Sequence, residues 1–466
     1  MTERNKTATT LVERLCASLT AAIESGQLPP GARLPSIRRQ ARDLGISTFT
    51  VADAYDRLLT RGYIQSRPGA GFYVQTRRGD SGARAGHSLA ELPIDEHWLL
   101  HKVYEHAERG VAAGGGWLPA QWYDVEALNR ALRGMARKGL ARLDYGDPRG
   151  LLPLRQWLAQ RVTEQGMAAT ADSFIMTQGA SQALEMVAAT VAQAGDTLLV
   201  DDPAYCNLLS SLTYRGFHLV GVPWTASGPD VDALRQLLTQ HRPRAYFTNP
   251  RLHNPTGASY SPAVAHQVVV LAEQHDFLLV EDDVSADLSA NRSLTLAALG
   301  GPSRVIHIGS FSKSMSPGLR VGYICASESR CEPLLRYKML SGLTTPELNE
   351  QLALAILEQR DYRRQLDRLR GRLSEAHYQA ERRFDALGWE LFARPGAGVY
   401  LLARPPAAGD SQPLAQAALK EDILLAPGRL FRPYSAPSPW LRFNVAFCQT
   451  PRLWEFLART GESPCT

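Results

Sequence analysis

One lysine of this chain lies among serines directly after an apolar run. Residues 305–308 predict a strand, Lys313 follows it within the stretch 309–323, and Arg320 comes one loop later. An amine at a strand end can form a Schiff base with an aldehyde cofactor, and nearby hydroxyls and a guanidinium suit a phosphate. The same pattern also describes a solvated junction between a strand and a loop, so other segments must decide.

Two further segments place small or aromatic residues after predicted strands. Gly179 precedes a helical stretch that begins with Ala180 and Ser181, where backbone N–H groups could meet an anion. Tyr205 follows the next apolar run and could stack on an aromatic ring. An ordinary helix cap and a core tyrosine explain the same residues.

Two more segments carry an amide and a cluster of acids. Asn254 lies between prolines and could donate a hydrogen bond to a phenolate oxygen. Glu281, Asp282 and Asp283 end an apolar run, where clustered carboxylates need a cation or a proton. A turn asparagine and a solvated strand end are the alternatives.

Taken together, the five segments are complementary to one ligand. Lys313 suits an aldehyde, Tyr205 a ring, Asn254 a phenolate and Asp282 a ring nitrogen. The serines, Arg320 and the helix after Gly179 suit a phosphate. That ligand is pyridoxal 5′-phosphate, and a carboxylate that keeps its pyridine nitrogen protonated makes the ring an electron sink.

The elements that would position these residues form an α/β domain. From about residue 92 onward, helical patterns alternate with short apolar runs such as 197–200, 277–280 and 305–308. This alternation predicts a mostly parallel sheet covered by helices. Ligands bind at the carboxyl ends of the strands in such sheets, which is where the informative polar residues fall.

Composition limits the class of protein. The 466 residues have no apolar run of membrane-spanning length, and the N-terminus lacks a signal-peptide core. The six cysteines are scattered without a C-x-x-C pair, which argues against disulfides or a zinc site and fits a reducing cytoplasm. We therefore expect a cytoplasmic protein without a membrane partner and without a bound metal.

The charge is unevenly distributed. Residues 1–80 hold twelve Lys+Arg against seven Asp+Glu, which accounts for the whole formal net charge of +5. A basic small region on a neutral larger one indicates a polyanion partner for the small region.

The first 78 residues read as a helix-turn-helix with a hairpin. Helices are predicted over about 9–25, 34–44 and 47–61, and residues 63–74 form two β-prone runs around a Pro-Gly turn. Ser47, Thr48 and Thr50 would open the third helix, with Arg38 and Arg67 beside it, and could meet phosphates or base edges of DNA. A small helical docking module with solvated arginines is the alternative.

This segment closely resembles the winged-helix domain of the GntR family of transcription regulators. The resemblance rests on Leu34, Pro35, Ser36, Arg38, Leu44, Gly45, Ile46, Ser47, Thr50, Val51, Ala54, Leu58, Gly62, Tyr63, Ile64, Arg67, Gly69 and Gly71. It implies double-stranded DNA as a partner, contacted through Arg38, Ser47, Thr48, Thr50, Arg67 and Gly69. We expect a DNA-binding domain over 1–78, a Gly- and Arg-rich linker over 79–94, and the large domain over 95–466.

The large domain resembles the fold type I aminotransferases, the aspartate aminotransferase family. By its motifs, Lys313 matches the catalytic Schiff-base lysine, and Arg442 matches the arginine that pairs with a substrate carboxylate. Tyr145 matches a tyrosine that reaches the phosphate across a dimer interface. The resemblance implies cofactor contacts from Tyr145, Ala180, Ser181, Tyr205, Asn254, Asp282, Ser310, Ser312, Lys313 and Arg320.

One position departs from that family. A tyrosine that bonds the phenolate oxygen usually follows the acidic pair, whereas Asp282 and Asp283 are followed here by Val284, Ser285 and Ala286. Cofactor binding should survive this change, but efficient transamination is not expected.

The combination of the two domains resembles the MocR group of bacterial regulators and implies a homodimer. We expect a transcription regulator that senses a small amino-group effector or pyridoxal phosphate itself. Two alternatives stay open, namely an aminotransferase that carries a DNA-binding domain, and a dimerisation scaffold with a vestigial pocket.

Overall fold

The computed structural model describes residues 11–24, 27–29, 31–67, 71–75, 98–99, 102, 110–139, 144–290, 295–406 and 409–461. The chain divides into two compact units, Met1–Leu92 and Pro93–Thr466. The predicted linker over 79–94 lies outside the described residues. Within those residues, no helix is long and apolar enough to cross a bilayer.

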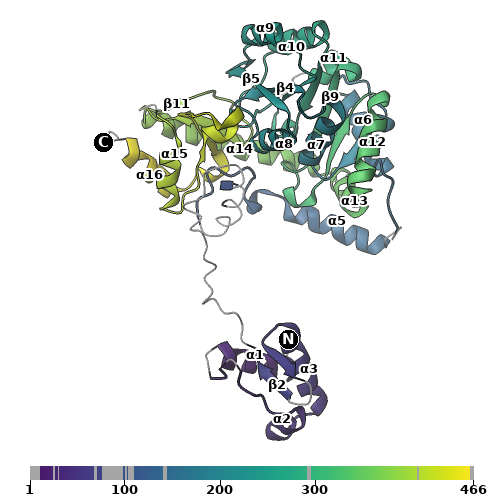
Figure 1. The fold of residues 1–466 in the computed structure, drawn as a ribbon, viewed down its shortest axis with the longest axis vertical. Helices are drawn as coiled ribbons and strands as arrows, with labels where there is room; N and C mark the ends of the chain where they lie inside the picture. The colour runs from purple at the N-terminus through teal and green to yellow at the C-terminus, as the bar shows by residue number, and fades with distance from the viewer. Residues whose placement is uncertain are drawn as a thin grey trace. The chain divides into compact units, whose positions relative to one another are not determined.

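The first unit is a winged helix, as the sequence predicts (Figure 1). Its helices are α1 (Leu11–Glu24), α2 (Ile37–Leu44) and α3 (Thr48–Thr60), and its wing pairs β1 (Ile64–Arg67) with β2 (Gly71–Val74) antiparallel. Gly45 ends α2 in the left-handed conformation, which favours glycine, so the turn into α3 is tight. The fully buried Val51, Tyr55 and Leu58 hold α3 against the other two helices.

The second unit is built on an eight-stranded sheet of order β3-β10-β9-β8-β7-β4-β5-β6. Neighbours from β9 to β5 are parallel, and the pairs β9–β10, β10–β3 and β5–β6 are antiparallel. The mostly parallel sheet is therefore confirmed. The strands are β3 (Phe174–Thr177), β4 (Thr197–Asp202), β5 (His218–Thr225), β6 (Gly228–Pro229), β7 (Ala245–Thr248), β8 (Leu278–Asp282), β9 (Val305–Ser310) and β10 (Gly322–Cys325).

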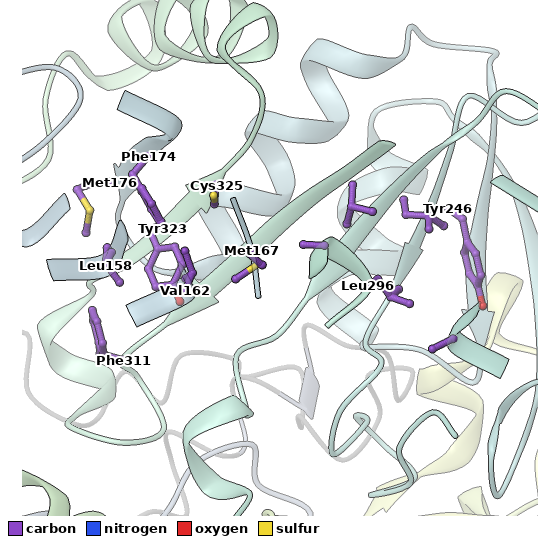
Figure 2. Close-up of a cluster of buried hydrophobic side chains, with 14 of the residues drawn as sticks. Leu158, Val162, Met167, Phe174, Met176, Tyr246, Leu296, Phe311, Tyr323 and Cys325 are labelled. Carbon is purple, nitrogen blue, oxygen red and sulfur yellow. The ribbon is translucent and has the colours of Figure 1, made fainter. Parts of the chain in front are cut away.

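Helices cover both faces of this sheet because its strands are apolar on both sides. One face packs against α7 (Ala180–Val191), α8 (Cys206–Tyr214) and α12 (Glu328–Gly342). Figure 2 shows the core on the opposite face, where Leu158 and Val162 of α6 lie beside Phe174 and Tyr323 of the sheet. The helices that contribute there include α6 (Leu152–Thr163), α9 (Val231–Gln240), α10 (Pro262–Gln274), α11 (Leu296–Arg304) and α13 (Glu347–Leu357).

A smaller antiparallel sheet of order β11-β12-β14-β13 follows the long helix α14 (Tyr362–Ala386). Residues 111–117 run beside this sheet and include a turn, and the backbone N–H groups of Val111 and Gly114 donate to the carbonyls of Asp422 and Leu424. This segment carries the carbonyl of Gly116 toward the main sheet. The remaining elements are α5 (Val125–Lys138), β11 (Glu390–Leu391), β12 (Tyr400–Arg404), α15 (Gln412–Leu419), β13 (Ala426–Pro427), β14 (Leu441–Asn444) and α16 (Pro451–Gly461).

Candidate cofactor site and nucleic-acid interface

The predicted cofactor residues follow strands that all run in one direction. β3, β4, β7, β8 and β9 therefore end at the same edge of the sheet. Gly179, Tyr205, Asn254, Asp282 and Lys313 come directly after, or at, those ends. The parallel arrangement thus collects side chains that are more than a hundred residues apart in the sequence.

Lys313 points to two groups that the sequence patterns do not reveal. Its Nζ donates to the carbonyl oxygen of Gly116 and lies 3.4 Å from the hydroxyl of Tyr400. The Tyr400 hydroxyl donates to the same carbonyl oxygen at 2.9 Å. Both partners reach the lysine through the smaller sheet and its flanking segment, so no local pattern around Lys313 could identify them.

The predicted phosphate residues lie together at the start of α7. Ser310 Oγ donates to Ser312 Oγ at 3.0 Å, and Arg320 Nη2 donates to the carbonyl of Gln178 at 2.9 Å. Gly179 has a φ of +81°, and a Cβ there would lie 2.6 Å from Arg320 Nη2. Only glycine lets the arginine lie against the helix N-terminus, where free N–H groups and a guanidinium suit an anion.

Tyr205 lies beside the same helix start. Burial raises the pKa of its phenol, while a hydrogen bond with Ser181 acts in the opposite direction. The phenol is therefore neutral and available as a flat apolar surface above a ring.

The three acids at the end of β8 have separate roles. Glu281 accepts hydrogen bonds from Leu296 N at 2.8 Å and from His307 Nδ1 at 3.0 Å. Although burial opposes the charge, His307 and the other donors lower the pKa of Glu281. Asp283 pairs with the buried guanidinium of Arg251 in a bidentate arrangement.

Asp282 differs from its neighbours because its carboxylate accepts only a long hydrogen bond, 3.4 Å from Val284 N, among the contacts of the described residues. Burial, with a contribution from Asp283, raises the pKa of Asp282 to about 7, and Val284 N and Lys313 reduce the effect. A protonated ring nitrogen would supply the cation that this carboxylate lacks.

Arg442 on β14 fixes the orientation of the predicted phenolate donor. Its Nη1 donates to Asn254 Oδ1 at 2.9 Å, and its Nη2 donates to the carbonyl of Gly114 at 2.6 Å. Because arginine can only donate, the Asn254 amide must present its oxygen to Arg442. The NH₂ group of Asn254 is then available to donate to a ligand. Among the described residues, Arg442 Nε has no hydrogen-bond partner, so one donor remains for a carboxylate.

Three of the predicted cofactor residues are exposed at the surface of the single chain, namely Tyr145, Ser181 and Arg320. The side chain of Tyr145 is 74% exposed, whereas Lys313, Asp282 and Arg442 are buried or half-buried.

A separate cavity of about 840 Å³ is lined by residues that follow Lys313, together with Trp117 and Tyr123. The side chains of Lys313, Asp282 and Asn254 do not line it. A cofactor site needs converging polar groups. The candidate site is therefore the edge of the sheet where the strands end, and not this separate cavity. The described part of the chain holds no His, Cys, Asp and Glu cluster suited to a metal ion.

In the first unit, the predicted DNA contacts lie at the start of α3. Ser47 caps the helix, accepting from Thr50 N at 3.0 Å, and its hydroxyl lies 2.8 Å from Thr50 Oγ1. Thr48 and Arg38 are exposed. Of the wing residues, the side chain of Arg67 and all of Gly69 lie outside the described residues.

Phe49 is 80% exposed beside these contacts, and the sequence patterns did not single it out. An exposed aromatic ring directly after a helix cap is the signal that could have identified it, because such a ring can contact a thymine methyl group.

Comparison with known proteins agrees with both units. The model of the family "Aminotransferase class I and II" matches residues 120–459, and that of the "Bacterial regulatory proteins, gntR family" matches residues 11–74. The chain belongs to the aminotransferase class I and II family, to which it adds a gntR-family helix-turn-helix domain. This is the composition of MocR-type regulators.

Relatives of the same two-domain composition align over most of the chain. The HTH-type transcriptional regulator YdcR of Escherichia coli is 29% identical over 93% of this chain and 95% of its own length. The protein named "Probable rhizopine catabolism regulatory protein MocR" of Rhizobium meliloti is 27% identical, over 89% of this chain and 85% of its own.

A solved structure matches the large unit. LysN, the alpha-aminoadipate aminotransferase of Thermus thermophilus, complexed with N-(5′-phosphopyridoxyl)-L-leucine, has a TM-score of 0.70 at 25% identity. The match covers 78% of this chain and 94% of LysN.

Proposed function

We propose that this chain is a transcription regulator that binds pyridoxal 5′-phosphate at Lys313 and responds to a small amino-group effector or to the cofactor itself. The observation that carries the proposal is the meeting of Lys313, Asp282 and the Asn254–Arg442 pair at one edge of the sheet. The same chain holds a winged helix, so ligand binding and DNA binding are joined covalently.

The residues present fit the cofactor. Asp282 is buried with a raised pKa and lacks a cationic partner among its described contacts. Asn254 faces the site with its NH₂ group, and Arg320 lies at the N-terminus of α7. Bound pyridoxal phosphate would supply an aldehyde that reacts reversibly with primary amines, either that of Lys313 or that of an effector.

Arg442 is the residue that would select effectors with a carboxylate. Its guanidinium lies 4.7 Å from the ring centroids of Tyr400 and Phe431, and its Nε has no partner among the described residues. A carboxylate beside a buried guanidinium gains a charge-assisted hydrogen bond. Amino acids should therefore act at lower concentration than the corresponding amines.

The regulator would be a cytoplasmic homodimer that reads two half-sites on double-stranded DNA. Exposed apolar side chains at the end of α12 and the start of α13 support the dimer, because Leu340, Leu343 and Leu348 are 80%, 50% and 50% exposed. Such a patch gains from burial against a second copy. Displacing Lys313 from the cofactor would then bias the dimer and change the spacing of the two winged helices.

A second candidate function is that of an aminotransferase. The retained lysine, aspartate and arginine favour it, as does the resemblance of the fold to LysN. The absence of a tyrosine directly after Asp282 and Asp283 counts against efficient turnover.

The test is visible absorption of the purified protein with pyridoxal phosphate, before and after adding amino acids and amines. A cofactor band that one compound shifts without keto-acid release supports the regulator. The same compound should then change binding to a fluorescent duplex selected from a random pool. Steady keto-acid production would favour the enzyme, and the lack of any band would overturn cofactor binding.

A further inference from the structure

The hydroxyl of Tyr400 lies beside the amine that would carry the cofactor. It is 3.4 Å from Lys313 Nζ, and the tyrosine side chain is only 2% exposed. Burial and contact with the reactive amine distinguish this phenol from the surface tyrosines Tyr145 and Tyr434.

The fold holds the Tyr400 ring from two sides. Tyr400 begins β12 opposite Asn444 of β14, and the guanidinium of Arg442, two residues before Asn444, lies 4.7 Å from the ring centroid. Asn444 Nδ2 donates to the carbonyls of Gly115 at 3.2 Å and Trp117 at 2.8 Å, on either side of Gly116. The acceptor of the Tyr400 hydroxyl is therefore fixed as well.

The carbonyl of Gly116 is a shared acceptor. Both the Lys313 amine and the Tyr400 hydroxyl donate to it. An amine that becomes linked to an aldehyde carbon keeps fewer N–H groups. The hydrogen bonds to the Gly116 carbonyl must therefore change when Lys313 is linked to the cofactor. The phenolate oxygen of a pyridoxal ring is on the carbon next to the one that bears the aldehyde, and hence close to the linked nitrogen.

We propose that Tyr400 is the phenol donor to that phenolate oxygen, in place of the tyrosine missing after Asp282 and Asp283. The inference rests on the proposed binding of pyridoxal phosphate at Lys313. Asn254 would approach from the main sheet, whereas Tyr400 approaches from the smaller sheet. A hydrogen bond to a charged oxygen stabilises the deprotonated form and lowers the pKa of the lysine–cofactor link.

The test is a pH titration of the cofactor's visible absorption in wild type and in Tyr400→Phe. Loss of a hydrogen bond to a charged group should raise the titration midpoint by about one to two pH units. Tyr123→Phe is the matched control, because the Tyr123 hydroxyl is near the same loop, 3.5 Å from the carbonyl of Ser312. Its midpoint should equal that of wild type.

The outcomes separate this inference from the proposed function. A band that is present in Tyr400→Phe with an unchanged midpoint overturns the role of Tyr400 and leaves cofactor binding intact. No band in wild type overturns the proposed function itself. If Tyr400→Phe does not fold, a wild-type midpoint as high as that of pyridoxal phosphate with a simple alkylamine in the same buffer overturns the role of Tyr400, because it contradicts any donor on the phenolate.

Discussion

The two units build their candidate sites in opposite ways. The DNA contacts predicted in the winged helix include Ser47, Thr48 and Thr50, which lie within one turn of α3. The cofactor site joins residues as far apart as Gly114 and Arg442, which are separated by 328 positions in the chain. The first site is local and exposed, whereas the second is distributed, and its central residues Lys313, Asp282 and Arg442 are buried or half-buried.

This difference teaches where function and stability can be separated. Exposed residues at a helix start can change without disturbing a core, so their loss should affect binding more than folding. Buried polar residues at a strand edge take part in both, because each is desolvated when the chain folds. The predictions below test that contrast.

The largest effect is expected from Lys313→Ala. The substitution should abolish attachment of pyridoxal phosphate to the chain, because no other lysine amine of the described residues contacts both Gly116 and Tyr400. Mass spectrometry after borohydride reduction measures this, as wild type should carry the added mass on the Lys313 peptide. Lys338→Met is the control, since Lys338 is also buried and burial lowers its pKa to about 8. Added mass on Lys338 in wild type would refute the assignment.

Asp282→Asn should change stability and cofactor affinity in opposite directions. The folded-state pKa is about 7, above the unfolded value, so the buried carboxylate costs stability as the pH rises from about 4 to 7. Asparagine should remove that cost and stabilise the cofactor-free protein by roughly 1 to 3 kcal/mol above the folded-state pKa, with no gain in acid.

The same variant should bind pyridoxal phosphate about 10- to 100-fold more weakly, since the charged partner of the ring nitrogen is lost. Urea unfolding at two pH values and a fluorescence titration with the cofactor measure the two effects. A loss of stability in Asp282→Asn above the folded-state pKa would contradict the predicted cost of the buried carboxylate.

Gly179→Ala should weaken cofactor binding about tenfold through backbone strain and displacement of Arg320. Gly195→Ala is the matched control, because Gly195 has a φ of +90° but nothing within 4 Å of an added Cβ. Both variants carry strain, and only the first disturbs the phosphate residues. If both reduce affinity equally in a titration with pyridoxal phosphate, the clash with Arg320 is not the cause.

Arg38→Ala should reduce DNA affinity roughly 3- to 10-fold without changing stability. If Arg38 contacts a phosphate, its loss should also reduce the slope of log affinity against log salt concentration by about one. Fluorescence anisotropy at several salt concentrations measures both quantities. Arg39→Ala serves as control, because Arg39 is on the same helix but lies 3.7 Å from Asp43. A larger loss of DNA affinity for Arg39→Ala than for Arg38→Ala would show that Arg39, and not Arg38, makes the contact.

The smallest effect is expected from Ser47→Ala. Loss of the N-cap of α3 should destabilise the winged helix by about 1 kcal/mol. Hydrogen exchange of the α3 amides in the full chain reports it, and Ser66→Ala, in an exposed strand position, should leave exchange unchanged. Unchanged exchange in both variants would show that the cap is not needed for the fold.

Local sequence patterns were sufficient to predict the helices and strands, but not to predict every side-chain contact at the site. The caps at Ser47 and Gly45 and the strands before Asp282 and Lys313 were predictable, because short-range periodicity and turn residues specify them. The pairing of Asp283 with Arg251, which leaves Asp282 for a ligand, was not visible in the acidic run. Side chains that meet across strands have no fixed spacing in the sequence.

The sequence by itself determined the two-part organisation, the fold of each part and most members of the candidate sites, because these depend on local residue types and on motifs. Only the tertiary structure decided which groups surround Lys313. Tyr400 comes to the lysine from the smaller sheet, and the Gly116 carbonyl comes from residues 111–117 beside that sheet. The physical reason is that such contacts arise from the packing of the smaller sheet and residues 111–117 against the strand edge, which no local pattern encodes.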